Sequence, residues 1–138
     1  MFRLSIVTPE KVVYDADIRS LTAPGTSGYL GILSQHAPII TALKPGKVEF
    51  RDAEDQLHIL AVTVGFLEVS ANKATILADA VEEADKIDIA RAREACRREK
   101  ARLVSAGGGE TDIDLPSCRA AIDRAANRIK IYEDTHKT

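Results

Sequence analysis

The fold is decided by residues 74–103, which read ATILADAVEEADKIDIARAREACRREKARL. Up to about Asp85 the apolar residues alternate with other residues, as at Ile76 and Ala78, whereas beyond it they recur three and four residues apart. Alternation is typical of a strand with one buried face, and a spacing of three and four is typical of an amphipathic helix. We therefore predict an all-β domain over residues 1–84 and a helical domain over residues 85–138.

Short alternating runs of apolar residues fill the part before this break. They are Phe2, Leu4 and Ile6; Val48 and Phe50; residues 57–62; Leu67 and Val69; and Ile76 and Ala78. Turn signals separate them at Pro9-Glu10, Pro24-Gly25, Pro45-Gly46, Asp52 to Asp55 and Asn72-Lys73. Many short strands at this spacing predict an antiparallel β-sandwich or flattened barrel. No pattern of helix length interrupts them, which argues against a parallel sheet.

Two helices are predicted after the break. The second carries one apolar stripe of coiled-coil type, formed by Leu115, Cys118, Ile122, Ala125, Ile129 and Tyr132. The first carries a thinner stripe of Ile89, Ala92, Cys96 and Leu103, with Ala95 beside it. We expect Asp88 to cap the first helix, Asp114 to cap the second, and Pro116 to lie in its first turn.

A glycine triplet, Gly107 to Gly109, separates the two helices and permits the chain to reverse. The expected architecture is therefore an N-terminal sandwich followed by an antiparallel two-helix hairpin. The stripes consist largely of small side chains and bury little apolar area, so we expect a marginally stable hairpin that a ligand or a partner can redirect.

Composition argues against several classes of protein. No stretch approaches the roughly 18 to 20 apolar residues of a membrane span, and the alternation at the start of the chain does not resemble a signal peptide. Cys96 and Cys118 are too few for a disulfide framework and are expected to be small core residues in a reducing compartment. His36 and His58 lack metal-ligand spacing, and no set of nucleophile, base and orienting group can be assembled. We expect no catalytic residue and no metal site.

Charge is unevenly distributed between the two parts. Residues 1–84 contain 7 basic and 11 acidic residues, whereas residues 85–138 contain 12 basic and 10 acidic residues. Arg91 and Arg98 return to nearly the same face of the first helix, and Arg124 and Arg128 share a face of the second. If the helices fold back on each other, the four guanidinium groups can converge on an anion such as a triphosphate.

A second interpretation of these arginines remains open. They can form a solvated basic face, with Glu94, Glu99 and Asp123 as nearby partners.

One segment is more specific than these patterns. Residues 28–46 read GYLGILSQHAPIITALKPG, and resemble the epsilon subunit of the bacterial F-type ATP synthase, whose signature is close to Gly-Ile-Leu-Pro-x-His-Ala-Pro followed by Lys-Pro-Gly. The segments GFLEV at 65–69 and LAD at 77–79 look like the same family, and the resemblance extends over the whole chain. The chain departs from it at Ser34, where Pro is usual; at Val64, where Gly is usual; and at Tyr29, where a polar or acidic residue is common.

The resemblance implies two groups of binding residues. Residues 87–92, IDIARA, match the motif through which some bacterial epsilon subunits bind ATP as a regulatory ligand. The nucleotide-binding residues carried over are Glu82, Ile87, Asp88, Arg91, Ala92, Arg98, Arg124 and Arg128. For Asp88 the helix-capping role stands beside this one. The partner-binding residues carried over are Tyr29, Leu30 and His36, on a loop that faces the membrane rotor ring; for His36 the alternative is a residue that organises the loop through backbone hydrogen bonds.

The resemblance also implies a function. The chain is expected to be a non-catalytic rotor subunit of the proton-translocating ATP synthase, peripheral to the cytoplasmic face of the bacterial plasma membrane. Its partners are the gamma subunit of the central stalk, the ring of c subunits and, when the helical arm extends and inhibits ATP hydrolysis, the alpha/beta catalytic hexamer. No nucleic acid is expected among them. The alternative is a stand-alone regulatory domain that binds nucleotides or other anions.

Overall fold

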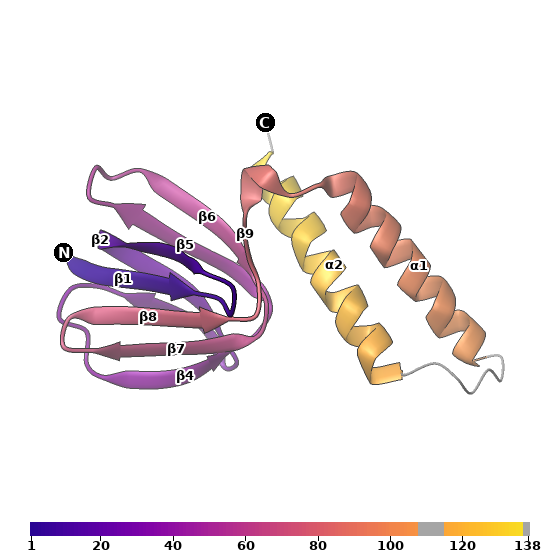
Figure 1. Ribbon diagram of the computed structural model, residues 1–138, viewed down its shortest axis with the longest axis horizontal. Helices are drawn as coiled ribbons and strands as arrows, with labels where there is room; N and C mark the ends of the chain where they lie inside the picture. Colours follow the sequence, from indigo (N-terminus) through magenta and orange to yellow (C-terminus); the bar gives the residue numbers. More distant parts are fainter. Residues whose placement is uncertain (108–114, 137–138) are drawn as a thin grey trace. The chain divides into compact units, whose positions relative to one another are not determined.

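The computed structural model describes residues 1–107 and 115–136 and divides the chain into two compact units, Met1–Glu83 and Ala84–Thr138 (Figure 1). The first unit, described throughout, is a nine-stranded sheet that folds into a sandwich. Its strands are β1 Phe2–Val7, β2 Val12–Gly25, β3 Gly28–Ile32, β4 Ile39–Leu43, β5 Gly46–Asp52, β6 Leu57–Val62, β7 Gly65–Ser70, β8 Lys73–Ala78 and β9 Val81–Glu83. The predicted fold class, a β-sandwich followed by two helices, is confirmed.

Strand β2 joins the two layers of the sandwich. Its first half pairs with β1, and its second half pairs with β5 and β3. The register of the β2–β5 pair shifts between Ile18 and Ser20. A bulge of this kind bends a strand, which lets one long strand contribute to both layers. In its first half Tyr14, Ala16 and Ile18 alternate with Asp15 and Asp17, a strand pattern that the sequence analysis did not include among its predicted strands.

Buried side chains from both layers form one apolar core. Leu4, Ile6 and Ile76 are fully buried on one group of strands, and Val48 and Phe50 are buried on β5. The predicted alternation is confirmed in β5, because Val48 and Phe50 point inward while Lys47 and Glu49 on the other face form an ion pair. In β6 both faces are buried only over its last three residues, Leu60 to Val62.

One sequence prediction for this unit is wrong, and the prediction of antiparallel pairing holds with one exception. Pro24-Gly25 is not a turn: both residues belong to β2, and the chain turns at Thr26 and Ser27 before Gly28 pairs with Gly25. Pro24 is buried, and its ring lies close to Gly46, where an added Cβ would lie 2.6 Å from the Pro24 Cβ. The sheet is also not wholly antiparallel, since β1 and β8 pair in parallel. The long chain between β1 and β8 makes this possible without a crossover helix.

The second unit begins with a short 3-10 helix, η1 Ala84–Lys86, and continues with helices α1 Ile89–Gly107 and α2 Leu115–Thr135. Pro116 is the second residue of α2, as predicted for the first turn. Gly107 is the last helical residue of α1, while the predicted break at Gly108 and Gly109 and the predicted cap Asp114 lie outside the described residues. Neither described helix is both long and apolar enough to cross a membrane.

Candidate functional site

The first turn of α1 carries three of the predicted nucleotide-binding residues. Asp88 caps the helix, because its Oδ1 accepts a hydrogen bond from the Arg91 backbone N–H at 3.1 Å. The Ala92 N–H donates to the Asp88 carbonyl at 3.0 Å, which begins the helical hydrogen bonding. Ile87 is 5% exposed and Ala92 is fully buried, so both are packing residues in this structure. The capping role predicted for Asp88 is confirmed.

The two helices pack along a seam of small side chains. We define the seam by the residues that share the facing stripes: Ile89, Ala92, Cys96, Glu99 and Leu103 of α1, and Cys118, Ile122, Ala125, Ile129 and Tyr132 of α2. The Cys118 thiol donates a hydrogen bond to the Glu99 backbone carbonyl at 3.0 Å, and this contact sets the level at which the helices meet. The predicted apolar stripe therefore contains a carboxylate, Glu99, at a position where the sequence showed only a gap between Cys96 and Leu103.

Helical geometry places five arginines on one side of this seam. Each of them directly precedes a seam residue: Arg91, Arg98 and Arg102 on α1, and Arg124 and Arg128 on α2. Successive residues of a helix are rotated by about 100° around its axis. In two antiparallel helices, the residues that directly precede seam residues in the sequence therefore lie on the same side of the hairpin, whichever helix they come from. We call these five residues the arginine flank. The four arginines expected to converge thus share one side of the hairpin, and Arg102 joins them.

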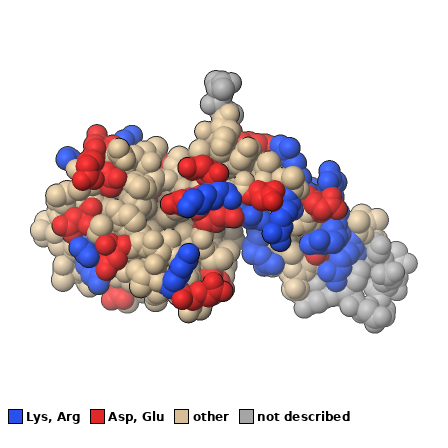
Figure 2. Space-filling model, turned by 45° about the horizontal axis from the view of Figure 1, so that its top comes forward, with Lys and Arg blue, Asp and Glu red and all other residues tan. Residues whose placement is uncertain are grey.

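The other side of the seam gives an independent check on this geometry. Arg93 follows Ala92, Glu133 follows Tyr132, and the two side chains form an ion pair between the helices, with Arg93 Nη2 3.4 Å from Glu133 Oε1. Residues that directly follow a seam residue in the sequence therefore meet on one side of the hairpin. Residues that directly precede a seam residue lie on the other side. Figure 2 shows how densely Lys and Arg cover the helical unit, compared with the mixed charges on the strand unit.

The arginines of this flank differ in their environment. Arg91 and Arg124 are exposed, and within residues 1–107 and 115–136 no carboxylate lies within ion-pair distance of either guanidinium. Arg128 is half-buried. Arg98 and Arg102 share the Glu99 carboxylate, with Arg98 Nε 3.8 Å from Oε1 and Arg102 Nη1 3.3 Å from Oε2. Of the alternative partners proposed for a solvated face, Glu94 pairs with Arg97 at 2.6 Å instead.

Glu82 belongs to the other unit. It lies on β9, half-buried, opposite Ala61 of β6. The remaining seven predicted nucleotide-binding residues all belong to the unit Ala84–Thr138.

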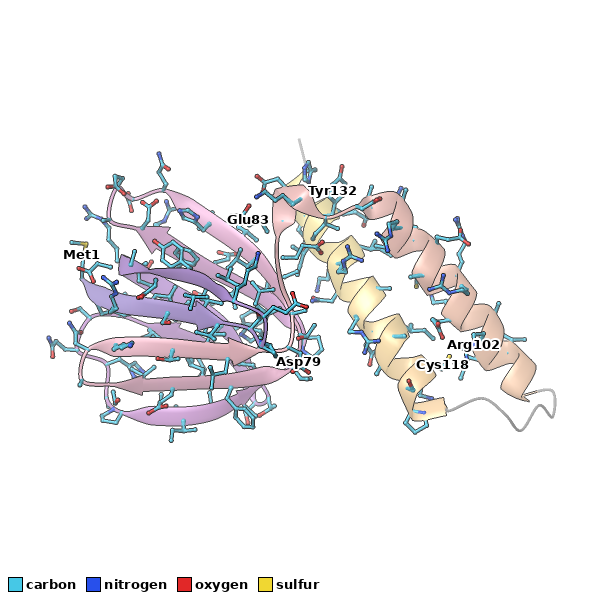
Figure 3. The ribbon with its side chains drawn as sticks, in the orientation of Figure 1. Met1, Asp79, Glu83, Arg102, Cys118 and Tyr132 are labelled. Atoms are coloured by element: carbon cyan, nitrogen blue, oxygen red, sulfur yellow. The ribbon has the colours of Figure 1, made fainter. Side chains whose placement is uncertain are left out.

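Both cysteines are buried in the seam, as expected for small core residues. Removal from water raises the pKa of the Cys118 thiol, and its contacts with Glu99 raise it further. Figure 3 shows Arg102 and Cys118 at the same level of the hairpin, on α1 and α2 respectively. A thiol with a raised pKa that is also buried reacts slowly with alkylating reagents, and its reactivity can report when the helices separate. Among the described residues, no group of His, Cys, Asp or Glu could hold a metal ion.

The predicted partner-binding residues lie on β3 and on the loop after it. Tyr29 is 54% exposed, and its hydroxyl accepts a hydrogen bond from the Lys47 N–H at 3.3 Å. Leu30, by contrast, is partly buried and packs against the apolar core. Tyr29 is therefore the more available of the two for a contact with another chain.

The loop that carries His36 is organised by hydrogen bonds. The His36 backbone N–H donates to the Leu33 carbonyl at 3.2 Å, and its Nδ1 lies 2.6 Å from the Ala37 carbonyl. Ser34, which stands where Pro is usual, donates through Oγ to the Met1 carbonyl at 3.3 Å. The loop-organising contacts considered for His36 are thus present. At position 34 the hydrogen bond of Ser34 takes the place of the rigid proline ring that is usual there.

Two functional residues were missed by the sequence reasoning. Asn72, on the β7–β8 turn, ties down the His36 loop by accepting from the Gln35 N–H at 2.9 Å and donating to the Met1 carbonyl at 3.0 Å. Sequence placed it only in a turn. Glu99 was considered only as a partner on a solvated surface, although the heptad spacing from Ala92 through Cys96 to Leu103 leaves position 99 as the missing member of the stripe.

Comparison with known protein families covers both units. A family described as "ATP synthase, Delta/Epsilon chain, beta-sandwich domain" matches residues 1–84, and one described as "ATP synthase, Delta/Epsilon chain, long alpha-helix domain" matches residues 85–133. The chain belongs to the ATP synthase delta/epsilon family. The resemblance inferred from residues 28–46 is thereby confirmed.

Individual relatives agree with this assignment. The ATP synthase epsilon chain of Desulforamulus reducens is 44% identical over 131 residues, which covers 95% of this chain and 96% of that protein. The ATP synthase epsilon chain of Moorella thermoacetica is 42% identical over 127 residues, with 92% of each chain covered.

Solved structures show the same fold at low sequence identity. A chain in the mitochondrial ATP synthase of Euglena gracilis, solved with OSCP, F1 and the c-ring, has a TM-score of 0.69 at 16% identity, and the match covers 96% of this chain and 77% of that one. A chain in the central stalk and c-ring of the Tetrahymena thermophila mitochondrial ATP synthase has a TM-score of 0.63 at 18% identity, covering 98% and 96%.

Proposed function

We propose that this delta/epsilon-family chain is a non-catalytic rotor subunit of a bacterial proton-translocating ATP synthase, peripheral to the cytoplasmic face of the plasma membrane. Membership of the family over residues 1–84 and 85–133 supports the role in the complex. The observation that carries the regulatory part is the arginine flank, which belongs to a compact unit separate from the strand unit. The chain is proposed to contact other subunits and to regulate ATP hydrolysis, and none of its residues is assigned a catalytic step.

The strand unit is proposed to dock on the gamma subunit and on the ring of c subunits. Its exposed apolar side chains support this assignment: Phe66 on β7 and Leu77 on β8 are cross-strand partners, 56% and 49% exposed. A contiguous apolar surface of this kind is typical of an interface between proteins. The exposed Tyr29, together with Leu30 and the His36 loop, is proposed to face the ring of c subunits.

The helical unit is proposed to bind ATP through the arginine flank. Arg91 and Arg124 lack a carboxylate partner among the described residues, and guanidinium groups bind phosphate oxygens through paired hydrogen bonds. Bound ATP would favour the folded hairpin by mass action, by about 1.4 kcal/mol at ten times Kd. An extended hairpin would instead reach the alpha/beta hexamer and inhibit hydrolysis. Ile87, Asp88 and Ala92 belong to the proposed site through the start of α1, which they pack or cap.

Calorimetry of the full chain with ATP tests the ligand. Arg91→Ala and Arg128→Ala each remove a guanidinium from the arginine flank, and we expect each to weaken ATP binding by about tenfold. Arg97→Ala is the matched control, because Arg97 lies on the same helix but on the other side of the seam, with its side chain 71% exposed. Equal ATP affinity in the wild type, Arg91→Ala and Arg128→Ala would rule out this site.

The alternative, a stand-alone domain that binds nucleotides or other anions, is favoured by the same arginines but makes a different prediction in cell extracts. A rotor subunit copurifies with the catalytic and membrane sectors of the ATP synthase. A stand-alone domain is recovered without them.

A further inference from the structure

We propose that Glu99 is a built-in counterion of the arginine flank: its carboxylate pairs with Arg98 and Arg102 and offsets one of their two positive charges in the absence of a bound anion, and it competes with an anion for them. The proposal deepens the anion-binding function above and rests on it for the identity of the ligand. The role of Glu99 without ligand does not depend on that identity.

The first observation is the burial of a charge in an apolar seam. The Glu99 residue is 8% exposed, and it lies in the stripe between Cys96 and Leu103, where every other seam residue of α1 is apolar. A carboxylate loses much of its hydration at such a position, and this cost is offset only by close positive partners. Arg102 provides two contacts, with Nη1 3.4 Å from Oε1 and 3.3 Å from Oε2.

The second observation is the lack of other negative charge on this side. We consider the described seam residues and the described residue that directly precedes each of them. Among these residues, the acidic ones are Glu99 and the helix cap Asp88. The same positions carry five arginines. Arg98 and Arg102 are four residues apart on one helix, as are Arg124 and Arg128, and like charges at that spacing repel each other. Glu99 lies between Arg98 and Arg102 and relieves that repulsion.

The third observation connects the carboxylate to the pairing of the helices. The backbone carbonyl of Glu99 accepts the Cys118 thiol hydrogen bond from α2, so the residue that pairs with the arginines also contacts the opposite helix. The carboxylate that pairs with the arginines and the contact with α2 therefore lie at the same position of α1. An anion bound to the arginine flank would take over the role of Glu99 as counterion of the arginines. The Glu99 carboxylate would also repel that anion.

This arrangement predicts opposite effects of removing the charge. Glu99→Gln keeps the size of the side chain but leaves the arginines without their internal counterion. Without ligand the hairpin should open more often. With a polyanion present the arginines should bind it more tightly, because a repelling carboxylate has been removed.

The rate at which Cys118 is alkylated measures opening of the hairpin. The full chain carries Cys96→Ala in every variant, so that Cys118 is the single thiol. Each rate is divided by the rate of the same variant unfolded in urea, which corrects for changes in the intrinsic reactivity of the thiol. The matched control is Glu94→Gln, which removes the same charge from α1 at a side chain that is 63% exposed and pairs with Arg97.

We expect Glu99→Gln to accelerate alkylation by about fivefold in the absence of anions, and Glu94→Gln by less than about twofold. Inorganic tripolyphosphate should slow the alkylation of Glu99→Gln by a larger factor than that of the wild type. If Glu99→Gln leaves the hairpin unfolded, tripolyphosphate should restore its helicity in circular dichroism.

Three results would overturn the proposal. They are an effect of Glu99→Gln no larger than that of Glu94→Gln, equal protection of wild type and Glu99→Gln by tripolyphosphate, and a Glu99→Gln hairpin that no polyanion refolds. The proposal that ATP is the ligand can fail independently of the role of Glu99. If tripolyphosphate protects Glu99→Gln more than the wild type, while ATP binds neither, Glu99 remains the counterion and the assigned ligand is wrong.

Discussion

At the scale of single residues, Asn72 connects three segments of the strand unit. Its side chain reaches the Met1 carbonyl before β1 and the Gln35 N–H in the loop after β3. Its own backbone has φ 59° and follows Ala71 at φ 50°, the left-handed pair that a two-residue hairpin turn requires. Asn tolerates this conformation better than most residues and also supplies the hydrogen bonds. The proposed rotor-facing loop is therefore held from the β7–β8 turn.

Replacing Asn72 should loosen that loop. We expect Asn72→Ala to lower the free energy of unfolding by about 2 kcal/mol, through lost hydrogen bonds and a strained backbone. Asn72→Gly removes the same bonds without the strain and should cost less. In both variants the Gln35 amide should exchange faster with solvent, as measured by NMR. An unchanged exchange rate at Gln35 would show that Asn72 does not hold the loop.

A second residue, Asp52, ties the end of β5 to the following loop and to β6. Its Oδ2 lies 2.8 Å from His58 Nε2, and its Oδ1 accepts hydrogen bonds from the Glu54 and Gln56 N–H groups. The His58 ring stacks on Phe50 at 4.6 Å, which keeps it in place. The hydrogen bond from His58 lowers the pKa of the Asp52 carboxyl, and the two backbone N–H groups lower it further.

This lowered pKa predicts a contribution to acid stability. The charged form is favoured in the folded state, so the stabilisation is complete above the ordinary Asp pKa of about 4 and is lost as the pH falls through the lower folded value. Urea midpoints of the wild type should therefore fall more steeply than those of Asp52→Asn between about pH 5 and about pH 2. Parallel pH profiles for the two proteins would contradict this.

At the scale of elements, β7 and β8 approach each other closely at Gly65. A Cβ added there would lie 2.0 Å from the Leu77 carbonyl oxygen, a backbone atom of the paired strand that cannot move aside. Gly65 pairs with Ala78 in the β7–β8 register, so the clash would fall inside a ladder of hydrogen bonds. The glycine is needed here for space, because its φ lies in the ordinary range for other residues.

Gly65→Ala should therefore destabilise the strand unit, by about 3 kcal/mol in chemical unfolding. Gly31→Ala on β3 is the matched control, because nothing lies within 4 Å of the added Cβ and the backbone is not left-handed. That variant should be within about 1 kcal/mol of the wild type, or slightly more stable. Similar losses in the two variants would show that crowding at Gly65 is not the cause.

At the scale of the whole molecule, the chain consists of two compact units joined near residue 84. The apolar core of the strand unit draws its residues from Phe2 to Ala78, and therefore closes without residues of the helices. The hairpin, by contrast, packs along a narrow seam that contains small side chains and a carboxylate.

A chain that ends after Asp85 should therefore unfold cooperatively and still join the ATP synthase. In the proposed function it should no longer inhibit ATP hydrolysis, because the arm that reaches the catalytic hexamer is missing. Reconstitution of the enzyme with full and shortened chains, followed by hydrolysis assays, measures this. A shortened chain that fails to assemble would contradict the division of roles between the units.

The sequence by itself determined the kinds of element and their order, because strand and helix periodicity, the Asp88 cap and the turn residues act over a few neighbours. It also determined the family, through residues 28–46. Only the tertiary structure decided which distant residues meet. Strand β2 spans both layers of the sandwich and β1 pairs in parallel with β8, because strand pairing depends on the closure of the whole sheet. Glu99 became a buried counterion because a second helix covers it, and no local pattern encodes where that helix lies.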